Sequence, residues 1–286
     1  MTVAYGSPPM VVRTSAYVWV LSFVTGPGTV SARQKLAGVS SASESFLNAR
    51  ADIEPVRDDW PYLYYNPSTI PLVYLASLVL IMVFGWFSVR SAMGNARSGF
   101  LAGIDWPMFF MGAAFLLVET KNISQLAILF GATWLTNMAV FASVFIVAIL
   151  ANLIVERKEV ANLPALYAAL GISLLLSYFL PFSSMTQLSL LSRAALGGTA
   201  TALPVLFSSF IFAKMFRETR QANNALGSNI LGGLLGGSIE SLSVFFGVRA
   251  MVLLAIAIYG ASWIAFTASH RRMEALPDAA EAVEKL

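Results

Sequence analysis

The stretch from Thr69 to Ser269 is nearly all apolar, and this feature constrains the fold of the chain more than any other. It is long enough for several membrane crossings, since one spanning helix needs about 20 apolar residues. Over the whole chain 57% of residues are apolar and 12% are charged, whereas soluble domains have roughly 45–50% and 25%. The sequence predicts an all-α integral membrane protein with a bundle of about seven transmembrane helices.

Composition divides the chain into three parts. Residues 1–67 form a short non-membrane N-terminal segment of ordinary soluble composition, interpreted as the remnant of a soluble domain. Residues 68–269 form the transmembrane bundle, and residues 270–286 form a charged tail. Cutting the bundle at its polar and Gly/Pro breaks gives seven spans: Thr69–Val89, Pro107–Phe130, Thr133–Val155, Pro164–Ser184, Leu188–Ala213, Gly227–Phe246 and Arg249–Ala268.

Basic residues indicate the orientation of the bundle. Lys and Arg favour the cytoplasmic side of short loops, and they alternate along this chain. The basic loops contain Arg90 and Arg97, Arg157 and Lys158, Lys214, Arg217 and Arg220, and Arg271 and Arg272. We therefore expect the carboxyl tail to be cytoplasmic, in a bacterial inner membrane, and an odd number of spans then places residues 1–67 outside. That segment itself has five bases and five acids, so its own charge favours neither side.

The residue counts exclude several kinds of chemistry. Cysteine is absent and His270 is the single histidine, so we expect no metal site, no cofactor and no catalytic residue. The net charge of +3 is too small and scattered to indicate nucleic-acid binding. The expected partners are the lipid bilayer and other membrane protein subunits, with a homo-oligomer as a further possibility.

Four ionisable residues fall inside the predicted spans. Charges in the hydrocarbon region cost a few kcal/mol each, so those that persist usually face the bundle interior and have partners. Glu119 and Lys121 are two positions apart, on different sides of one helix, and do not pair well with each other. The predicted intramembrane charge cluster comprises Glu119, Lys121, Arg193 and Glu240. The expected pairing is Glu119 or Glu240 with Lys121 or Arg193. Such a cluster either fixes helix packing or lets the two carboxylates bind a cationic solute or pass protons. A third alternative is that the second span is broken near Thr120–Ser124, which places the charges in water.

The sixth predicted span is rich in glycine. Gly232, Gly233, Gly236 and Gly237 form two overlapping pairs of small residues four positions apart. This spacing lets the backbones of two membrane helices approach closely, so we expect these glycines to lie at a helix-packing surface. A soft helix that moves during transport is the alternative interpretation.

Several segments resemble membrane-bound spermidine-synthase-like proteins, in which a soluble aminopropyltransferase-type domain precedes a block of membrane helices. Asp58, Asp59, Trp60 and Pro61, followed by Tyr62-Leu63-Tyr64 and Ile70-Pro71, resemble the junction before that block. The segments that resemble the block itself are Phe109–Glu119, Leu129-Phe130-Gly131 and Asn229–Glu240. The resemblance implies descent from the membrane half of that architecture.

The family's catalytic half is largely missing from this chain. A Rossmann-type nucleotide site needs a Gly-rich turn after the first strand and an acidic residue further on, and residues 1–67 contain neither pattern. Ala16–Val24 resembles only the closing strand of such a domain, although the same run also fits a signal-peptide core. Gly26-Pro27-Gly28 is interpreted as a turn.

Three functions fit these observations. The first is a non-catalytic integral membrane subunit or scaffold, a pseudoenzyme that docks a partner protein complex. The second is a small transporter or channel-like protein for a cation or polyamine, with Glu119 and Glu240 as the binding carboxylates. The third is the membrane half of a split aminopropyltransferase- or methyltransferase-like enzyme, whose catalytic chain is separate.

Overall fold

The computed structural model describes residues 10–13, 21–24, 72–93, 101–131, 133–158, 162–219 and 221–274. The chain forms two units, Met1–Pro55 and Val56–Leu286. In the first unit, β1 (Met10–Arg13) pairs antiparallel with β2 (Leu21–Val24), with Met10 opposite Val24. β2 lies in the apolar run Ala16–Val24.

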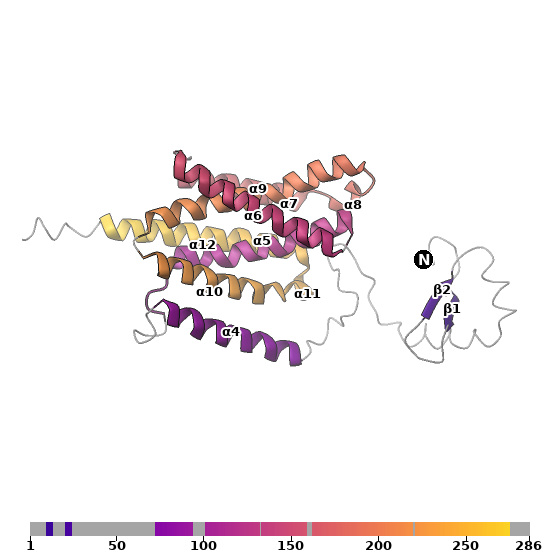
Figure 1. The fold of residues 1–286 in the computed structure, drawn as a ribbon, viewed down its shortest axis with the longest axis horizontal. Helices are drawn as coiled ribbons and strands as arrows, with labels where there is room; N and C mark the ends of the chain where they lie inside the picture. Colours follow the sequence, from indigo (N-terminus) through magenta and orange to yellow (C-terminus); the bar gives the residue numbers. More distant parts are fainter. Residues whose placement is uncertain are drawn as a thin grey trace, which may run out of the picture. The chain divides into compact units, whose positions relative to one another are not determined.

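The second unit is a helical bundle in its described part (Figure 1). Four helices form its central part: α5 (Trp106–Phe130), α9 (Leu190–Glu218), α10 (Ala222–Glu240) and α12 (Val248–Glu274). Three more pack around these: α4 (Leu72–Ala92), α6 (Trp134–Arg157) and α7 (Leu163–Phe179). The short α8 (Phe182–Met185) and α11 (Ser243–Phe246) precede α9 and α12.

Five of these helices, α4, α5, α6, α9 and α12, are long and apolar enough to cross a membrane. These helices fit a multi-pass integral membrane protein. The two other predicted spans correspond to α7, which has only 17 residues, and α10, which is not among the five. α7 ends at Phe179 because Pro181 cannot donate a helical hydrogen bond and disfavours helix before it.

Polar side chains cap the N-termini of several helices. Asp105 accepts a hydrogen bond from the Met108 N–H (3.1 Å) at the start of α5. Asn162 accepts from the Ala165 N–H (3.1 Å) at the start of α7. Thr133 and Ser189 cap α6 and α9 in the same way. Each side chain satisfies a backbone donor that the first helical turn leaves free.

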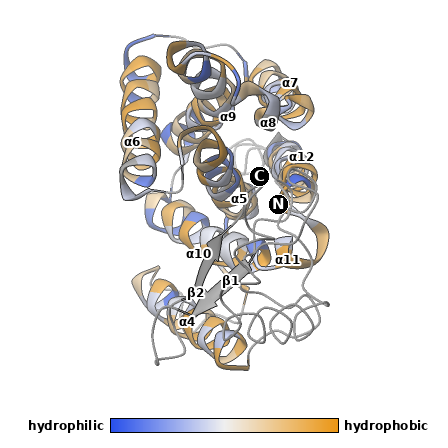
Figure 2. Cartoon of the chain, turned by 90° about the vertical axis from the view of Figure 1, so that its right-hand side faces the viewer, coloured by the Kyte–Doolittle hydropathy of each residue, from blue (hydrophilic) through white to orange (hydrophobic). Residues whose placement is uncertain are grey.

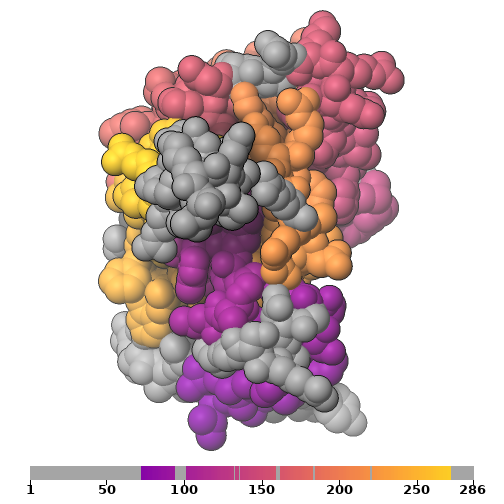
Figure 3. Space-filling view, turned by 90° about the vertical axis from the view of Figure 1, so that its left-hand side faces the viewer, coloured from indigo at the N-terminus to yellow at the C-terminus, as the bar shows by residue number. Residues whose placement is uncertain are grey.

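α5 is the centre of the bundle. It packs closely against α10 and α12, and also against α9 and α6. In Figure 3 the beginning of α5 lies between the orange of α10 and the yellow of α12. The core around it contains Met108, Met111 and Leu117 of α5, together with Ile211 of α9 and Val252 of α12. Figure 2 shows the apolar colour on the outer sides of α4 and α6, which α5 does not cover.

Hydrogen bonds from two arginines of α9 show which ends of the bundle the helix joins. Arg193, near the start of α9, donates to the Leu129 carbonyl at the end of α5 (3.0 Å). Arg217, near the end of α9, donates to the Val155 carbonyl at the end of α6 (2.7 Å). Because α5 and α6 are joined by a short connection and run in opposite directions, these two carbonyls lie at opposite ends of the bundle. α9 therefore crosses the full thickness of the bundle, and each arginine satisfies a carbonyl that a helix end leaves free.

Candidate functional site

The middle of α5 carries consecutive polar residues between two apolar stretches. Successive helical residues point about 100° apart, so these side chains reach different neighbouring helices. We call the resulting group the polar layer. It comprises Glu119, Thr120, Lys121, Asn122 and Gln125 of α5, Ser177 of α7, Thr201 of α9 and Glu240 of α10.

Lys121 is the most deeply buried charged group of the polar layer, with 2% of its surface exposed. Its ammonium donates to the Ser177 hydroxyl, with 2.5 Å between Nζ and Oγ. This is the only hydrogen-bond partner of Lys121 among the described residues, and no carboxylate there contacts it. A buried cation usually needs a charged partner or several hydrogen bonds, so the single bond to a neutral hydroxyl leaves Lys121 under-compensated.

Asn122 links α5 to α9. Its Nδ2 donates to the Thr201 carbonyl (3.0 Å), but its Oδ1 has no hydrogen-bond partner in the described structure. Asn122 also borders a cavity of about 10 Å³, together with Ser143 and Thr201. That volume is close to what one water molecule occupies. Gln125 Oε1, one turn further along α5, is likewise buried without a partner, so two acceptors of the polar layer remain unsatisfied.

The two carboxylates lie on α5 and α10. Glu240, the last residue of α10, lies against the Thr120 hydroxyl of α5. Glu119 precedes Thr120 and is half-buried, as is Glu240. Neither carboxylate forms an ion pair with Lys121 or Arg193 in the described structure. The arrangement is suited to binding a cation or a hydrogen-bond donor, because the acceptors of the polar layer outnumber its donors.

Arg193 stands apart from the other three predicted cluster residues. Its guanidinium donates to the Leu129 carbonyl, two turns along α5 from Lys121, or about 12 Å. Its Nε is buried without a partner. The structure thus brings Glu119, Lys121 and Glu240 to one level of α5 and places Arg193 at the end of that helix. The predicted pairing of Arg193 with Glu119 or Glu240 is absent from the described structure, and α5 continues without a break through Thr120–Ser124.

The glycines of α10 lie along α5. A Cβ built on Gly232 would collide with the Phe109 carbonyl, and one on Gly236 with the Ala113 carbonyl. Gly112 of α5 approaches the Asn229 carbonyl in the same way. At Gly237 a Cβ would lie 2.9 Å from Leu116 Cδ2, and at Gly233 it would lie 3.9 Å from the Gly112 oxygen. Within the described α5–α10 contact, a Cβ would therefore collide with backbone at Gly232, Gly236 and Gly112.

Polar contacts also surround the start of α5. The Asp105 N–H donates to the Ser228 hydroxyl of α10 (2.8 Å), and Asn229 Nδ2 donates to the Met108 carbonyl (3.1 Å). Partial burial raises the pKa of the Asp105 carboxyl above its ordinary value of 3.8, and the hydrogen bond from the Met108 N–H offsets part of that rise. These contacts fix the position of α10 along α5.

The remaining predicted site residues are placed as follows. Asp58, Asp59, Trp60 and Pro61, the family-like junction, lie outside the described residues. The described residues contain no group of three or more His, Asp and Glu side chains that could hold a metal ion. The sequence reasoning missed Asn122, Gln125, Ser177 and Thr201, although the polar run on α5 was a visible signal for the first two.

No protein-family model, curated protein or solved structure matches this chain.

Proposed function

We propose that this protein is a non-catalytic integral membrane subunit that docks a partner protein complex. The observation that carries the proposal is the outer surface of α4. α4 packs mainly on α10, where Gly85 meets Leu234 and Met93 meets Gly227. Arg90 is the only buried residue of the helix. No other candidate span in the described structure is so little covered by its own chain.

The uncovered face of α4 has the pattern of a helix-packing surface. Five apolar residues of α4 are more than two-thirds exposed: Leu72, Val73, Leu80, Phe84 and Phe87. We call the last four, which share one face, the outer α4 stripe. The spacings of seven, four and three residues place these side chains on one face. Lipid covers apolar side chains without any preference for spacing. A second helix fits this stripe by shape, which is the main source of association between membrane helices.

Purification in mild detergent tests the proposal. The tagged protein is isolated from its native membranes, and its size and co-purifying chains are determined by mass spectrometry. We expect a stoichiometric partner that is lost in the Leu80→Ala/Phe84→Ala variant. The matched control is Phe145→Ala/Ile149→Ala on the exposed face of α6, which should retain the partner. A wild-type protein that purifies as a monomer or homodimer alone contradicts the proposal.

The identity of the partner also tests the resemblance to spermidine-synthase-like proteins. If this chain descends from their membrane half and works as part of a split enzyme, the partner is a soluble Rossmann-type chain. A partner that is itself an integral membrane protein favours the scaffold function instead.

We further propose seven membrane crossings in a bacterial inner membrane, with the carboxyl tail cytoplasmic and the N-terminal segment outside. The positions of Arg193 and Arg217 support it, because α9 starts and ends at opposite sides of the bundle. The chain must then also cross between α6 and α9, which requires α7 to span. Since the chain has no cysteine, single Ser189→Cys and Thr219→Cys variants can be labelled in intact cells. Seven crossings expose position 189 outside and position 219 inside, whereas five crossings without α7 and α10 reverse both.

A second candidate function is transport of a small cation or polyamine, favoured by the half-buried Glu119 and Glu240, which have no cation partner in the described structure. Flux into proteoliposomes tests it. Glu119→Gln and Glu240→Gln should each reduce uptake at least tenfold, while Glu156→Gln at the exposed end of α6 should not. Absence of uptake by the wild-type protein rejects this candidate.

A further inference from the structure

α10 ends about halfway along α5. A Cβ built on Gly236 would meet the Ala113 carbonyl. Further along both helices Glu240 lies against the Thr120 hydroxyl, so α10 and α5 run in the same direction. α10 ends at Glu240, whereas α5 continues from Thr120 to Phe130, about 15 Å further. In Figure 1 α11 is set back along the bundle from α8. The end of α10 therefore lies inside the thickness of the bundle.

α12 starts at the same level of α5. Ser262 donates to the Pro107 carbonyl (2.8 Å), which aligns this part of α12 with the start of α5. α12 begins at Val248, about 21 Å of helix before Ser262. The same length of α5, counted from Pro107, ends at Lys121. Residues 241–247, which we call the α10–α12 turn, thus lie at the level of the polar layer.

The α10–α12 turn satisfies backbone donors within itself. The Leu242 N–H donates to the Ile239 carbonyl (2.9 Å), and the Gly247 N–H donates to the Ser243 carbonyl (2.8 Å). Gly247 has a φ of 81°, which glycine adopts without strain, and α12 starts directly after it. Backbone at membrane depth needs such internal partners, so the chain can reverse at this level.

Three ionisable side chains lie at the level of the turn. Arg249, in the first turn of α12, is exposed, and Glu119 and Glu240 are half-buried. Ionisable groups at membrane depth almost always face the bundle interior or water. The turn also exposes Phe245 and Phe246, which lipid can cover from the side, but lipid does not solvate a guanidinium. Water at the turn therefore accounts for the exposed Arg249.

Close contacts separate the turn from the start of α5. Gly232 and Gly236 bring the backbone of α10 against that of α5. On α12, Val252 and Ala255 are 2% and 0% exposed and belong to the core around α5. Water therefore does not reach the turn along α5 from that direction.

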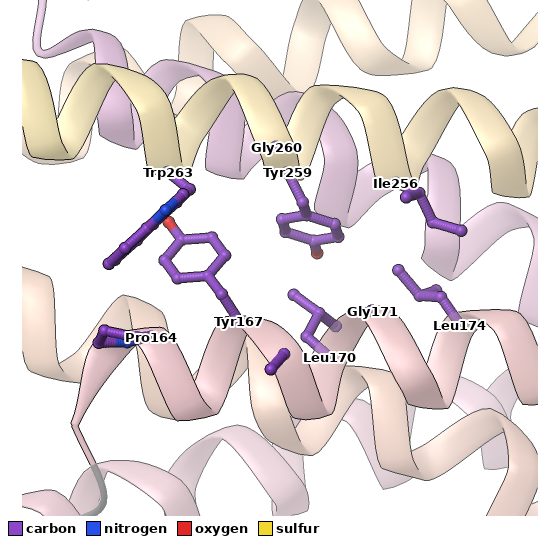
Figure 4. Close-up of a pocket in the computed structure, with 10 residues that line it drawn as sticks. Pro164, Tyr167, Leu170, Gly171, Leu174, Ile256, Tyr259, Gly260 and Trp263 are labelled. Carbon is purple, nitrogen blue, oxygen red and sulfur yellow. The ribbon is translucent and has the colours of Figure 1, made fainter.

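The space between α7 and α12 gives water no route either. It contains a cavity of about 340 Å³ that Gly171 and Gly260 leave open, because a Cβ on either would meet nothing within 4 Å (Figure 4). The cavity lining is apolar or aromatic, as at Leu174 and Ile256, and includes no residue of the polar layer. Apolar cavities stay dry, so this one does not conduct water to the polar layer.

Beyond the turn, α5 is less covered. The face of α5 that meets α10 is buried at Gly112 and Ala113. It continues at Ser124 and Ala127, which are partly exposed. Both α10 and α12 stop short of this part of α5. The open direction is therefore that of the end of α5, and not that of its start.

We propose that water from the outer side reaches the α10–α12 turn, so that Glu119 and Glu240 are accessible from outside and closed off from the cytoplasm. The inference rests on the seven crossings proposed above, which place the end of α5 outside and require the chain to face the outer side between α10 and α12. It also deepens the second candidate function. A cation would enter from the outer side, and its release inside requires α10 to separate from α5 at Gly232 and Gly236.

Cysteine labelling tests the proposal, because the chain has no cysteine of its own. A positively charged methanethiosulfonate that does not cross membranes is added to intact cells. Ser241→Cys reports on the turn. We expect Ser241→Cys to react at least about tenfold faster than Phe145→Cys, because the reactive thiolate forms in water and not in apolar surroundings. Arg249→Cys is the second reporter if Ser241→Cys does not assemble.

Phe145→Cys is a control matched in depth. Phe145 is about 17 Å of helix from the start of α6, and Thr120 is about 15 Å from the end of α5. The Phe145 side chain is 67% exposed on the outside of the bundle, where lipid covers it. Equal rates at Ser241→Cys and Phe145→Cys overturn the proposal.

Two further positions separate failure of this inference from failure of the proposed crossings. Ser189→Cys should react in intact cells and Thr219→Cys only in inside-out vesicles. If both do so but Ser241→Cys reacts from neither side, lipid covers the turn and the proposal is overturned. Reaction of Ser241→Cys in inside-out vesicles alone also overturns it, because the opening then faces the cytoplasm. If Ser189→Cys reacts only in inside-out vesicles, the crossings themselves are wrong and this inference fails with them.

Discussion

The Lys121 ammonium and the Ser177 hydroxyl form one hydrogen bond that joins α5 to α7 inside the bundle. The bond pairs a charged donor with a neutral acceptor, in a region where no described carboxylate contacts the cation. This hydrogen bond gives the buried Ser177 hydroxyl of α7 a partner. The stability of the α5–α7 contact therefore depends on Lys121 and Ser177, which can be substituted one at a time.

Ser177→Ala should destabilise the protein by about 1–3 kcal/mol, because the Lys121 ammonium then has no hydrogen-bond partner. Lys121→Met should cost less, since replacing a buried charge by an apolar side chain removes the need for a partner. The measurement is the melting temperature in detergent. Ser173→Ala is the control, because Ser173 is also buried on α7 but donates only to the Leu170 carbonyl of its own helix. If Ser173→Ala costs as much as Ser177→Ala, the bond to Lys121 contributes nothing specific.

Glu119→Gln and Lys121→Met should have additive effects on stability. The two side chains lie about 200° apart around α5, and neither contacts the other in the described structure. Residues without shared partners usually add within about 0.3–0.5 kcal/mol. A double-mutant cycle measured by melting in detergent checks this. A coupling energy above about 1 kcal/mol would show that the two groups interact within one network.

The four glycines of the predicted packing surface of α10 should respond to alanine in a defined order. Gly232→Ala and Gly236→Ala place a Cβ against α5 carbonyls that cannot move independently, and we expect each to cost more than about 2 kcal/mol, as overpacked contacts do. Gly237→Ala meets only the end of the Leu116 side chain and should cost little. Gly233→Ala has ordinary contact distances and should be neutral or stabilising, since alanine favours helix by up to about 1 kcal/mol.

The same four variants provide their own control, because they share one helix and one type of substitution. Melting temperature and yield in detergent rank them. Equal effects at Gly233 and Gly232 would mean that helix propensity, and not the contact with α5, determines the outcome.

The stability of the bundle should depend on the protonation of Asp105. Burial raises the pKa of this carboxyl in the folded state above 3.8, so the folded state holds the proton more tightly than the unfolded state. The penalty for ionising Asp105 is absent below pH 3.8, grows as the pH rises through the interval up to the folded pKa, and is complete above it. Stability should therefore fall with rising pH across that interval.

Asp105→Asn isolates this effect. Asparagine caps a helix about as well as aspartate, so the variant keeps the bond to Met108 but does not ionise. Melting temperatures of the two proteins should converge at low pH, and the variant should be the more stable one above the interval. Parallel pH profiles for the two proteins would contradict the assignment to Asp105.

The sequence predicted the positions of most helices but not all of their ends. Long apolar runs in the sequence located α4, α5, α6, α9 and α12, because a membrane span needs such a run. The end of α7 depends on Pro181, and the predicted span ran through it to Ser184. α12 continues to Glu274, beyond the predicted span end at Ala268. Apolar length predicts only the part of a helix that lies in the membrane, and a helix can extend past it.

Which side chains meet was less predictable than which helices form. The sequence predicted that Glu119, Lys121, Arg193 and Glu240 lie within spans and that the α10 glycines pack against a helix, but it did not indicate which helices are neighbours. Ser177 and the Leu129 carbonyl were therefore not anticipated as partners of Lys121 and Arg193. Nor did the sequence indicate the cavity between α7 and α12, since Gly171 and Gly260 look like any glycines of a membrane helix until the space around them is known.

The central position of α5 has a consequence for the order of synthesis. α5 emerges early, yet α10 and α12, its principal neighbours, are made roughly a hundred residues later. Until then the surface with Gly112 and Thr120 faces lipid or an assisting protein, while α6 is already present. The polar layer closes only after Glu240 has entered the membrane. A ribosome that stops before α10 thus leaves an incomplete bundle with polar groups exposed to lipid, a form that membrane quality control can recognise.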